Sequence, residues 1–178
     1  MNQQLIAQSQ AEAVIEEPWK SIDLTEWVFT LTDSEYRACS KNHIAAGTSR
    51  TPDGKRMSVN VEHVGNLMIQ HYVEDVSRRD HCRLISLSDS IGPSVDSRVK
   101  VIVIWECRVE ALDDKRTTFA NRVEVQSADG YMAALEKRGV SLAQASQVAQ
   151  SALSAHNAEE TPLFARDIER KAKGGRWL

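Results

Sequence analysis

One segment, SRVKVIVIWECRVEAL at residues 97–112, constrains the fold of this chain more than any other. Two sets of side chains alternate along it: Val99, Val101, Val103, Trp105, Cys107 and Val109 on one side, and Lys100, Ile102, Ile104, Glu106 and Arg108 on the other. Successive side chains of a strand point to opposite faces, so this alternation predicts a long β-strand. It is the strongest strand signal in the chain.

Further strands are expected on both sides of this segment in the sequence. The segments RMSVNVEHV, LMIQHYVEDV, HCRLISLSDSIG and TTFANRVEVQ alternate in the same way, and short turns such as TPDGKR and DDKR separate them. In LMIQHYVEDV, one face carries Leu67, Ile69, His71 and Val73, and the other carries Met68, Gln70, Tyr72 and Glu74. Strands at hairpin spacing predict an antiparallel meander.

The N-terminal part of the chain gives weaker signals. Residues 1–17 are rich in Gln, Ala and Glu, and we expect a polar segment that is helical or disordered, followed by a single domain over residues 18–175. The β-branched and aromatic stretch TEWVFTL predicts a first strand. Asp33 is a plausible N-cap for one or two short helical segments that carry Tyr36, Cys39 and His43.

After Ser127 the pattern becomes helical. A first helix is expected up to Gly139, and Ser141 can cap a second, long helix that Thr161-Pro162 kinks or restarts. Apolar or small residues recur along the long helix at steps of three or four, and His156 and Glu160 continue the same stripe: Leu142, Ala145, Ala149, Leu153, His156 and Glu160. The long helix is the element able to cover one face of the sheet.

Composition and charge exclude several classes of protein. The chain has 178 residues with 42% hydrophobic and 26% charged side chains, as expected for one globular domain. A net charge of −3 gives no attraction to nucleic acid or to an anionic membrane. No membrane-spanning run and no secretory signal is recognisable, and the three cysteines lack a CxxC spacing, which favours reduced thiols and a cytoplasmic protein. The aliphatic-rich strands leave dimerisation open.

The order of elements over residues 20–173, with stretches such as WVFTLTDSEYRA and TTFANRVEV, resembles the START-related and birch-allergen (SRPBCC) superfamily. The resemblance implies an α+β helix-grip fold, in which a curved antiparallel sheet wraps around a long C-terminal helix and short helices follow the first strand. It also implies an apolar cavity between sheet and helix for lipids, polyketides or aromatic compounds. The expected lining residues are Tyr72, Trp105, Ala149, Leu153 and His156.

His156 and Glu160 are the first candidates for chemistry. They lie four residues apart, so they share one face of the helix. A buried carboxylate needs a partner or a cation, and Zn²⁺ accepts both imidazole and carboxylate ligands. The two residues therefore form half of a metal site or an acid–base pair; alternatively, they lie half-exposed at the helix end, with Glu160 paired to an Arg or Lys.

The His156–Glu160 pair is also similar to the HxxxE pair on the C-terminal helix of the diacetylphloroglucinol and phloretin hydrolases. These enzymes share the helix-grip fold and hold zinc with two His and two Glu. By that resemblance, His43 and Glu74 are the expected remaining ligands, and His63 and His71 compete with His43.

Three functions follow from these observations. The first is a protein that binds a small hydrophobic or aromatic molecule, with no metal required. The second is a zinc-dependent hydrolase or cyclase that acts on an aromatic or polyketide ketone in the same cavity; it predicts that at least three of His43, His71, Glu74, His156 and Glu160 converge. The third is an interaction protein without a cavity of ligand size. Individual catalytic residues are not assigned.

Overall fold

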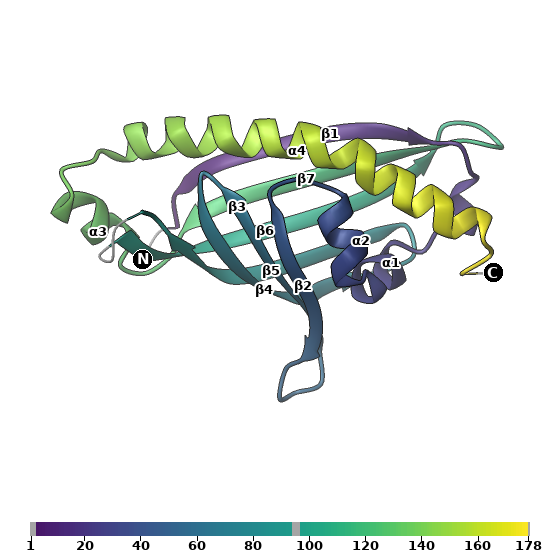
Figure 1. Ribbon diagram of the computed structural model, residues 1–178, viewed down its shortest axis with the longest axis horizontal. Helices are drawn as coiled ribbons and strands as arrows, with labels where there is room; N and C mark the ends of the chain where they lie inside the picture. Colours follow the sequence, from purple (N-terminus) through teal and green to yellow (C-terminus); the bar gives the residue numbers. More distant parts are fainter. Residues whose placement is uncertain (1–2, 94–96, 178) are drawn as a thin grey trace.

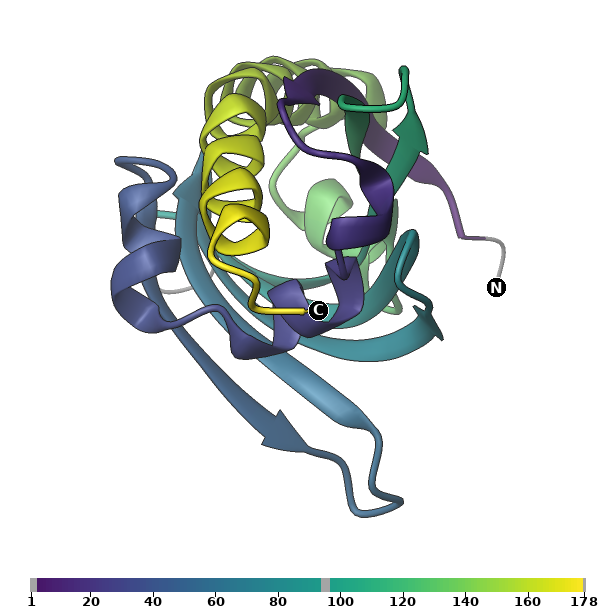
Figure 2. The ribbon, with the colours of Figure 1, turned by 90° about the vertical axis from the view of Figure 1, so that its right-hand side faces the viewer.

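A computed structural model describes residues 3–93 and 97–177, and it shows a curved sheet folded around one long helix (Figures 1 and 2). The sheet has seven antiparallel strands in the order β1-β7-β6-β5-β4-β3-β2. Their bounds are Leu5–Ile15 (β1), His43–Arg50 (β2), Arg56–Val64 (β3), Asn66–Ser77 (β4), His81–Ile91 (β5), Arg98–Ala111 (β6) and Thr117–Ser127 (β7). The long helix α4 spans Leu142–Lys173. The predicted α+β helix-grip fold is confirmed.

Short helices lie at both ends of the sheet (Figure 1). A 3₁₀ turn, Trp19–Ser21, and the helices α1 (Leu24–Thr30) and α2 (Asp33–Ala38) connect β1 to β2. Helix α3 (Tyr131–Lys137) leads from β7 into α4. Among the described residues, no helix combines the length and apolar character needed to span a bilayer.

The second half of helix α4 is more deeply buried than its first half. Its buried residues begin at Leu153 and continue to Ala172. Two polar contacts fix the C-terminal part: Trp27 Nε1 donates to Asp167 at 2.9 Å, and Lys171 Nζ donates to Glu35 at 3.0 Å. The N-terminal part, from Leu142, is half-buried or exposed. The end of α4 that approaches α1 and α2 is therefore the more deeply buried one, whereas Gln150 ties the first half to β1 through two hydrogen bonds with the Gln8 backbone.

The inner face of the sheet changes character from strand to strand. On β6 the aliphatic face lies inward, and Val101, Val103 and Trp105 are buried. On β3 the polar face lies inward: Ser58 and Asn60 are buried, whereas the aliphatic residues alternating with them are only half-buried. Strand pairing is in register across β3 and β4, so the inner face of β4 consists of Met68, Gln70 and Tyr72. Polar side chains thus face α4 from β3 and β4.

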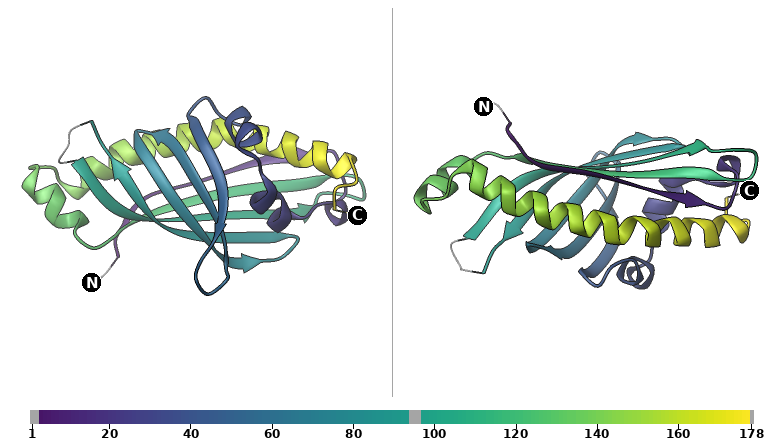
Figure 3. Two further views of the ribbon diagram at one scale, coloured as in Figure 1. Left: turned by 60° about the horizontal axis from the view of Figure 1, so that its bottom comes forward. Right: turned by 90° about the horizontal axis from the view of Figure 1, so that it is seen from above.

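The prediction of a helical or disordered segment over residues 1–17 is wrong. Residues 5–15 form β1, which pairs with β7 and runs beside α4 (Figure 3). Small side chains alternate toward the interior, including Ala7, Ala11 and Ala13, while Gln8 and Glu12 point outward. Gln, Ala and Glu have low strand propensity, but pairing with β7 overrides local preference here. The domain therefore includes this segment.

The prediction of a strand at TEWVFTL is also wrong, because residues 24–30 form α1. The side chain of Asp23 accepts a hydrogen bond from the Glu26 backbone and caps the helix. Leu24, Trp27 and Val28 are buried at helical spacing. The helical spacing was not recognised in the sequence because aromatic and β-branched residues favour strands.

Two further expectations need correction. The helical segment that begins at Asp33 ends at Ala38, so His43 opens strand β2 instead of continuing a helix. Pro162 lies inside one continuous helix, α4, and does not restart it. The hydroxyl of Thr161, just before the proline, donates to the backbone carbonyl of Asn157 at 2.6 Å, one turn back along the same helix.

The two neighbours Ile15 and Val14 provide a test of β1 as an integral strand. Ile15 is 0% exposed and Val14 is 47% exposed. We expect Ile15→Ala to lower the free energy of unfolding by about 3 kcal/mol, because it leaves a cavity, and Val14→Ala by less than about 1 kcal/mol. Chemical denaturation of both variants measures the difference. Equal small losses would contradict the placement of β1 in the core.

Candidate metal centre

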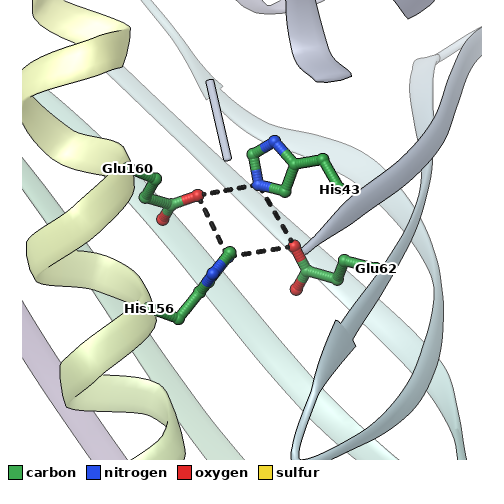
Figure 4. Close-up of side chains that lie close together, drawn as sticks. All are labelled: His43, Glu62, His156 and Glu160. Carbon is green, nitrogen blue, oxygen red and sulfur yellow. Dashed lines mark hydrogen bonds and ion pairs between the residues drawn. The ribbon is translucent and has the colours of Figure 1, made fainter. Parts of the chain in front are cut away.

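Two histidines and two glutamates converge between α4 and the edge of the sheet (Figure 4). His43 is the first residue of β2, Glu62 lies on β3, and His156 and Glu160 lie one turn apart on α4. One ligand atom from each of the four residues lies within 4.8 Å of all the others. Three residues expected from the sequence, His43, His156 and Glu160, are thus brought together, and the fourth is Glu62.

His43 is held with its Nε2 atom toward this centre. Its Nδ1 lies 2.6 Å from the backbone carbonyl of Tyr36, and a carbonyl only accepts, so Nδ1 carries the proton. The Tyr36 ring stacks on the imidazole with centroids 3.8 Å apart. Nε2 faces the centre and lies within hydrogen-bond distance of Glu160 Oε2, at 3.1 Å; with a metal ion bound it would be the ligand atom. A second hydrogen bond of this kind is the usual support of a metal-binding histidine.

Both carboxylates are oriented by donors on their outer sides. The strand register places Glu62 opposite His43, so the two enter the centre from adjacent strands. Tyr36 Oη donates to Glu62 Oε2 at 2.9 Å, and Gln70 Nε2 donates to Glu62 Oε1 at 2.8 Å. Asn121 Nδ2 donates to Glu160 Oε1 at 3.1 Å. Each carboxylate keeps Oε2 toward the two imidazoles.

The four separations between imidazole nitrogens and carboxylate oxygens are close to those between neighbouring ligands of one metal ion. His43 Nε2 lies 3.1 Å from Glu160 Oε2 and 3.6 Å from Glu62 Oε2. His156 Nε2 lies 3.2 Å and 3.3 Å from the same two oxygens. Zinc bonds of about 2.0–2.2 Å correspond to a tetrahedron with edges of roughly 3.3–3.6 Å. Within the described residues, neither ring nitrogen of His156 has a hydrogen-bond partner, although Nε2 lies close to both carboxylates.

Charge supports the same reading of the centre. Two carboxylates in a buried site require a compensating positive charge. Burial opposes protonation of His156, but the adjacent carboxylates of Glu160 and Glu62 outweigh it and raise the pKa of His156 to about 10. Burial likewise favours neutral Glu160, but His156 and His43 lower the pKa of that carboxyl. The charge of a divalent cation would balance both carboxylates with both imidazoles neutral.

Glu74, the expected fourth ligand, is occupied elsewhere. It lies on the same face of β4 as Gln70 and Tyr72, but further along the strand, where Arg56 reaches it. Its Oε1 accepts from the Arg56 backbone at 2.8 Å, and its Oε2 accepts from Arg56 Nε at 3.0 Å. Of the competing histidines, His63 is exposed and His71 lies on the half-buried outer face. Neither belongs to the centre.

Glu62 was not predicted as a ligand because its position depends on the pairing register of β2 and β3, and no sequence motif marks it. In RMSVNVEHV the polar set Ser58, Asn60 and Glu62 alternates with an aliphatic set, and the aliphatic set is the obvious candidate for the core. The structure turns the polar set inward. Only the pairing of β2 with β3 places Glu62 next to His43.

An apolar cavity of about 470 Å³ lies between the sheet and the first half of α4. The sheet contributes valines of β6 and β7, and the helix contributes small or aliphatic residues: Val101, Val103, Val123, Val125, Ala145, Ala149 and Leu153. A narrow inner space next to the metal centre shares four lining residues with it: Glu62, Gln70, Val123 and Leu153. This cavity excludes the third function considered above, which required none of ligand size.

All five residues expected to contact a ligand line one of these two spaces. Ala149 and Leu153 line the wide cavity, and Tyr72, Trp105 and His156 line the inner space together with Leu153. Burial and the charge of Glu62 raise the pKa of Tyr72 well above its usual value, so its hydroxyl keeps its proton. The inner space, of about 30 Å³, thus lies between the apolar cavity and three of the four residues, Glu62, His156 and Glu160.

Comparison with known proteins bears on the fold. No family profile and no curated protein matches the chain. Among solved structures, the Zhui aromatase/cyclase from Streptomyces sp. R1128 is similar with a TM-score of 0.64 and 13% identity, covering 96% of each chain. A START superfamily protein from Mycobacterium smegmatis is similar with a TM-score of 0.55 and 10% identity, covering 92% of this chain and 97% of the other.

The di-domain aromatase/cyclase StfQ of the steffimycin pathway gives a TM-score of 0.57 at 10% identity, over 94% of this chain and 53% of its own length. At such identities the likeness concerns architecture. It confirms that the chain has the helix-grip fold seen in START-like proteins, as the sequence resemblance implied.

The raised pKa of His156 makes a prediction for the protein after metal chelation. A histidine whose pKa rises on folding stabilises the native state below its unfolded pKa, near 6.5, and this stabilisation is lost as the pH rises toward about 10. We expect the free energy of unfolding to fall between about pH 7 and about pH 10. Denaturation of chelated protein across this range measures the slope.

His156→Gln is the control for this slope, because it removes the titrating imidazole and keeps a polar side chain. The slope should become shallower in that variant, while other groups continue to titrate. An unchanged slope in His156→Gln would contradict the assigned role of the imidazole.

Proposed function

We propose that the protein is a zinc-dependent hydrolase that acts on a small aromatic or polyketide-type ketone bound in the cavity. The observation that carries this proposal is the group of two imidazole nitrogens and two carboxylate oxygens at the inner end of an apolar cavity. His43, Glu62, His156 and Glu160 would hold the metal. A cavity that only binds a hydrophobic molecule has no need of two buried carboxylates and two buried imidazoles.

The order of these residues along the chain supports the hydrolase class. The resemblance to the diacetylphloroglucinol and phloretin hydrolases implies two His and two Glu, with the last two in an HxxxE pair on the C-terminal helix. His156 and Glu160 occupy that pair, and His43 and Glu62 supply one further residue of each type. Replacing Glu74 by Glu62 completes the set that the resemblance requires.

The reaction class can be written with all atoms balanced. In hydrolysis of an aryl ketone, the oxygen of water bonds to the carbonyl carbon, the bond from that carbon to the ring breaks, and the ring carbon takes a proton. The products are a carboxylic acid and the deacylated ring. A bound zinc ion would polarise the ketone or lower the pKa of a water molecule.

The chain's own residues would bind the substrate, exclude water from the site and supply a proton. The valine-lined wall of β6 and β7 accommodates an apolar ring, and its low polarity strengthens electrostatic interactions at the centre. Tyr72 faces the inner space beside His156 and Glu160 and keeps its proton at neutral pH. We assign Tyr72 the role of holding the proton that the ring carbon receives.

A second candidate is a carrier that binds a lipid, polyketide or aromatic metabolite without transforming it. The apolar lining and the size of the cavity favour this function independently of the centre. A carrier would bind such a molecule equally well with the metal ligands removed, whereas the hydrolase would lose turnover.

Zinc content provides the first test. We expect about one zinc per chain in the purified protein and loss of most of it in Glu62→Gln and in His156→Ala, because each removes one of four ligands. Glu74→Gln is the matched control: it removes a strand carboxylate that is bound to Arg56, and it should retain zinc. Elemental analysis with a folding check by circular dichroism measures both.

If wild-type protein is folded but takes up no zinc after incubation with the ion, the metal-dependent function is wrong and the carrier remains. Zinc loss in Glu74→Gln with retention in Glu62→Gln would likewise contradict the centre described above.

Turnover tests the role of Tyr72. Phloretin and diacetylphloroglucinol are the first substrates to assay, by release of the carboxylic acid. We expect Tyr72→Phe to lower kcat by about 100-fold or more, as for loss of a general acid, with unchanged zinc content. A Tyr72→Phe enzyme with wild-type kcat would show that the proton comes from another group.

A further inference from the structure

Each carboxylate of the metal centre is held by one side-chain amide. Gln70 Nε2 donates to Glu62 Oε1 at 2.8 Å, and Asn121 Nδ2 donates to Glu160 Oε1 at 3.1 Å. An ionised carboxylate only accepts hydrogen bonds, so each amide must turn its nitrogen toward the glutamate. The amide oxygen then faces away from the glutamate in both cases.

The two amide oxygens differ in what they meet. Asn121 Oδ1 accepts a hydrogen bond from Trp105 Nε1 at 2.9 Å. Gln70 Oε1 is buried, and none of the described residues donates to it. The Gln70 residue as a whole is only 4% exposed. Buried polar atoms of native proteins are normally paired, so an unpaired carbonyl beside a candidate active site indicates a missing partner.

Gln70 lies at the boundary between the wide cavity and the inner space. It lines the wide cavity and also the inner space that contains His156 and Glu160. The other residues shared by both spaces are Glu62, which only accepts when ionised, and the aliphatic Val123 and Leu153. None of these three side chains can donate to Gln70 Oε1.

We propose that Gln70 is a specificity-determining residue whose Oε1 accepts a hydrogen bond from a hydroxyl group of the ligand. The preferred ligand is then an apolar ring that carries a neutral hydroxyl near the group that reaches the metal centre. A cationic ammonium donor would be repelled by the metal ion, whereas a neutral hydroxyl is not. This inference rests on the proposed function, since it takes the inner space as the reaction site.

The test uses two probes, 1-naphthol, which carries a hydroxyl donor, and 1-methoxynaphthalene, in which a methyl group replaces the hydroxyl hydrogen. Binding of each to the zinc-incubated protein is measured by isothermal titration calorimetry. Wild type should bind the naphthol about 10-fold tighter than the ether, because the ether leaves the amide oxygen unpaired. Equal affinities in wild type would overturn the proposal.

Variants then separate Gln70 from the metal as the source of the preference. Gln70→Met keeps the length of the side chain and removes the acceptor, and Gln70→Asn withdraws it; both should bring the affinity ratio close to one. Tyr36→Phe is the matched control, because it also removes a donor to Glu62 but leaves the Gln70 oxygen in place. It should keep the preference for the naphthol.

A preference that persists in Gln70→Met and Gln70→Asn would overturn the proposal, since the hydroxyl would then be recognised by the metal centre or by another group. Zinc content, measured on the same samples, reports separately on the proposed function. Protein without zinc that still loses its preference on Gln70 substitution would refute the metal centre and retain the role of Gln70.

Discussion

The burial of two carboxylates between α4 and β3 is the constraint on which the rest of the site depends. Glu62 and Glu160 approach the same point from a strand and a helix that are far apart in sequence. Like charges in a dry site are unfavourable unless positive charge and hydrogen bonds compensate. Tyr36, Gln70 and Asn121 supply the hydrogen bonds, and the two imidazoles lie where they or a bound cation would supply the charge. A group of this kind specifies chemistry more strongly than the fold around it does.

The parts of the structure that the sequence predicts well are those with a long period. The alternation along residues 97–112 identifies β6, and the stripe on α4 places His156 and Glu160 toward the sheet. Both signals extend over many residues, so tertiary contacts seldom override them. The order of elements was enough to predict the helix-grip fold, although the first strand was assigned to the segment that forms α1.

The parts that failed depend on pairing between distant segments. β1 is a strand because β7 offers it an edge, which its Gln- and Ala-rich composition does not announce. Glu62 joins the centre because of the register of β2 against β3, and Glu74 is withdrawn by Arg56 from an adjacent strand. The HxxxE pair could be found from residue type and spacing, and His43 from the resemblance to the hydrolases; their carboxylate neighbour required the three-dimensional arrangement.

The difference in burial between the two halves of α4 has a consequence for the cavity and for the ligating residues. Contacts to Trp27 and Glu35 hold the part that carries His156 and Glu160, and the part over the cavity, before Leu153, is less buried and is bound to β1 through Gln150. Substitutions in the first half of α4 would therefore change the shape of the cavity and leave the four ligand atoms at their separations. The shape of the cavity and the positions of His156 and Glu160 thereby depend on different halves of a single helix.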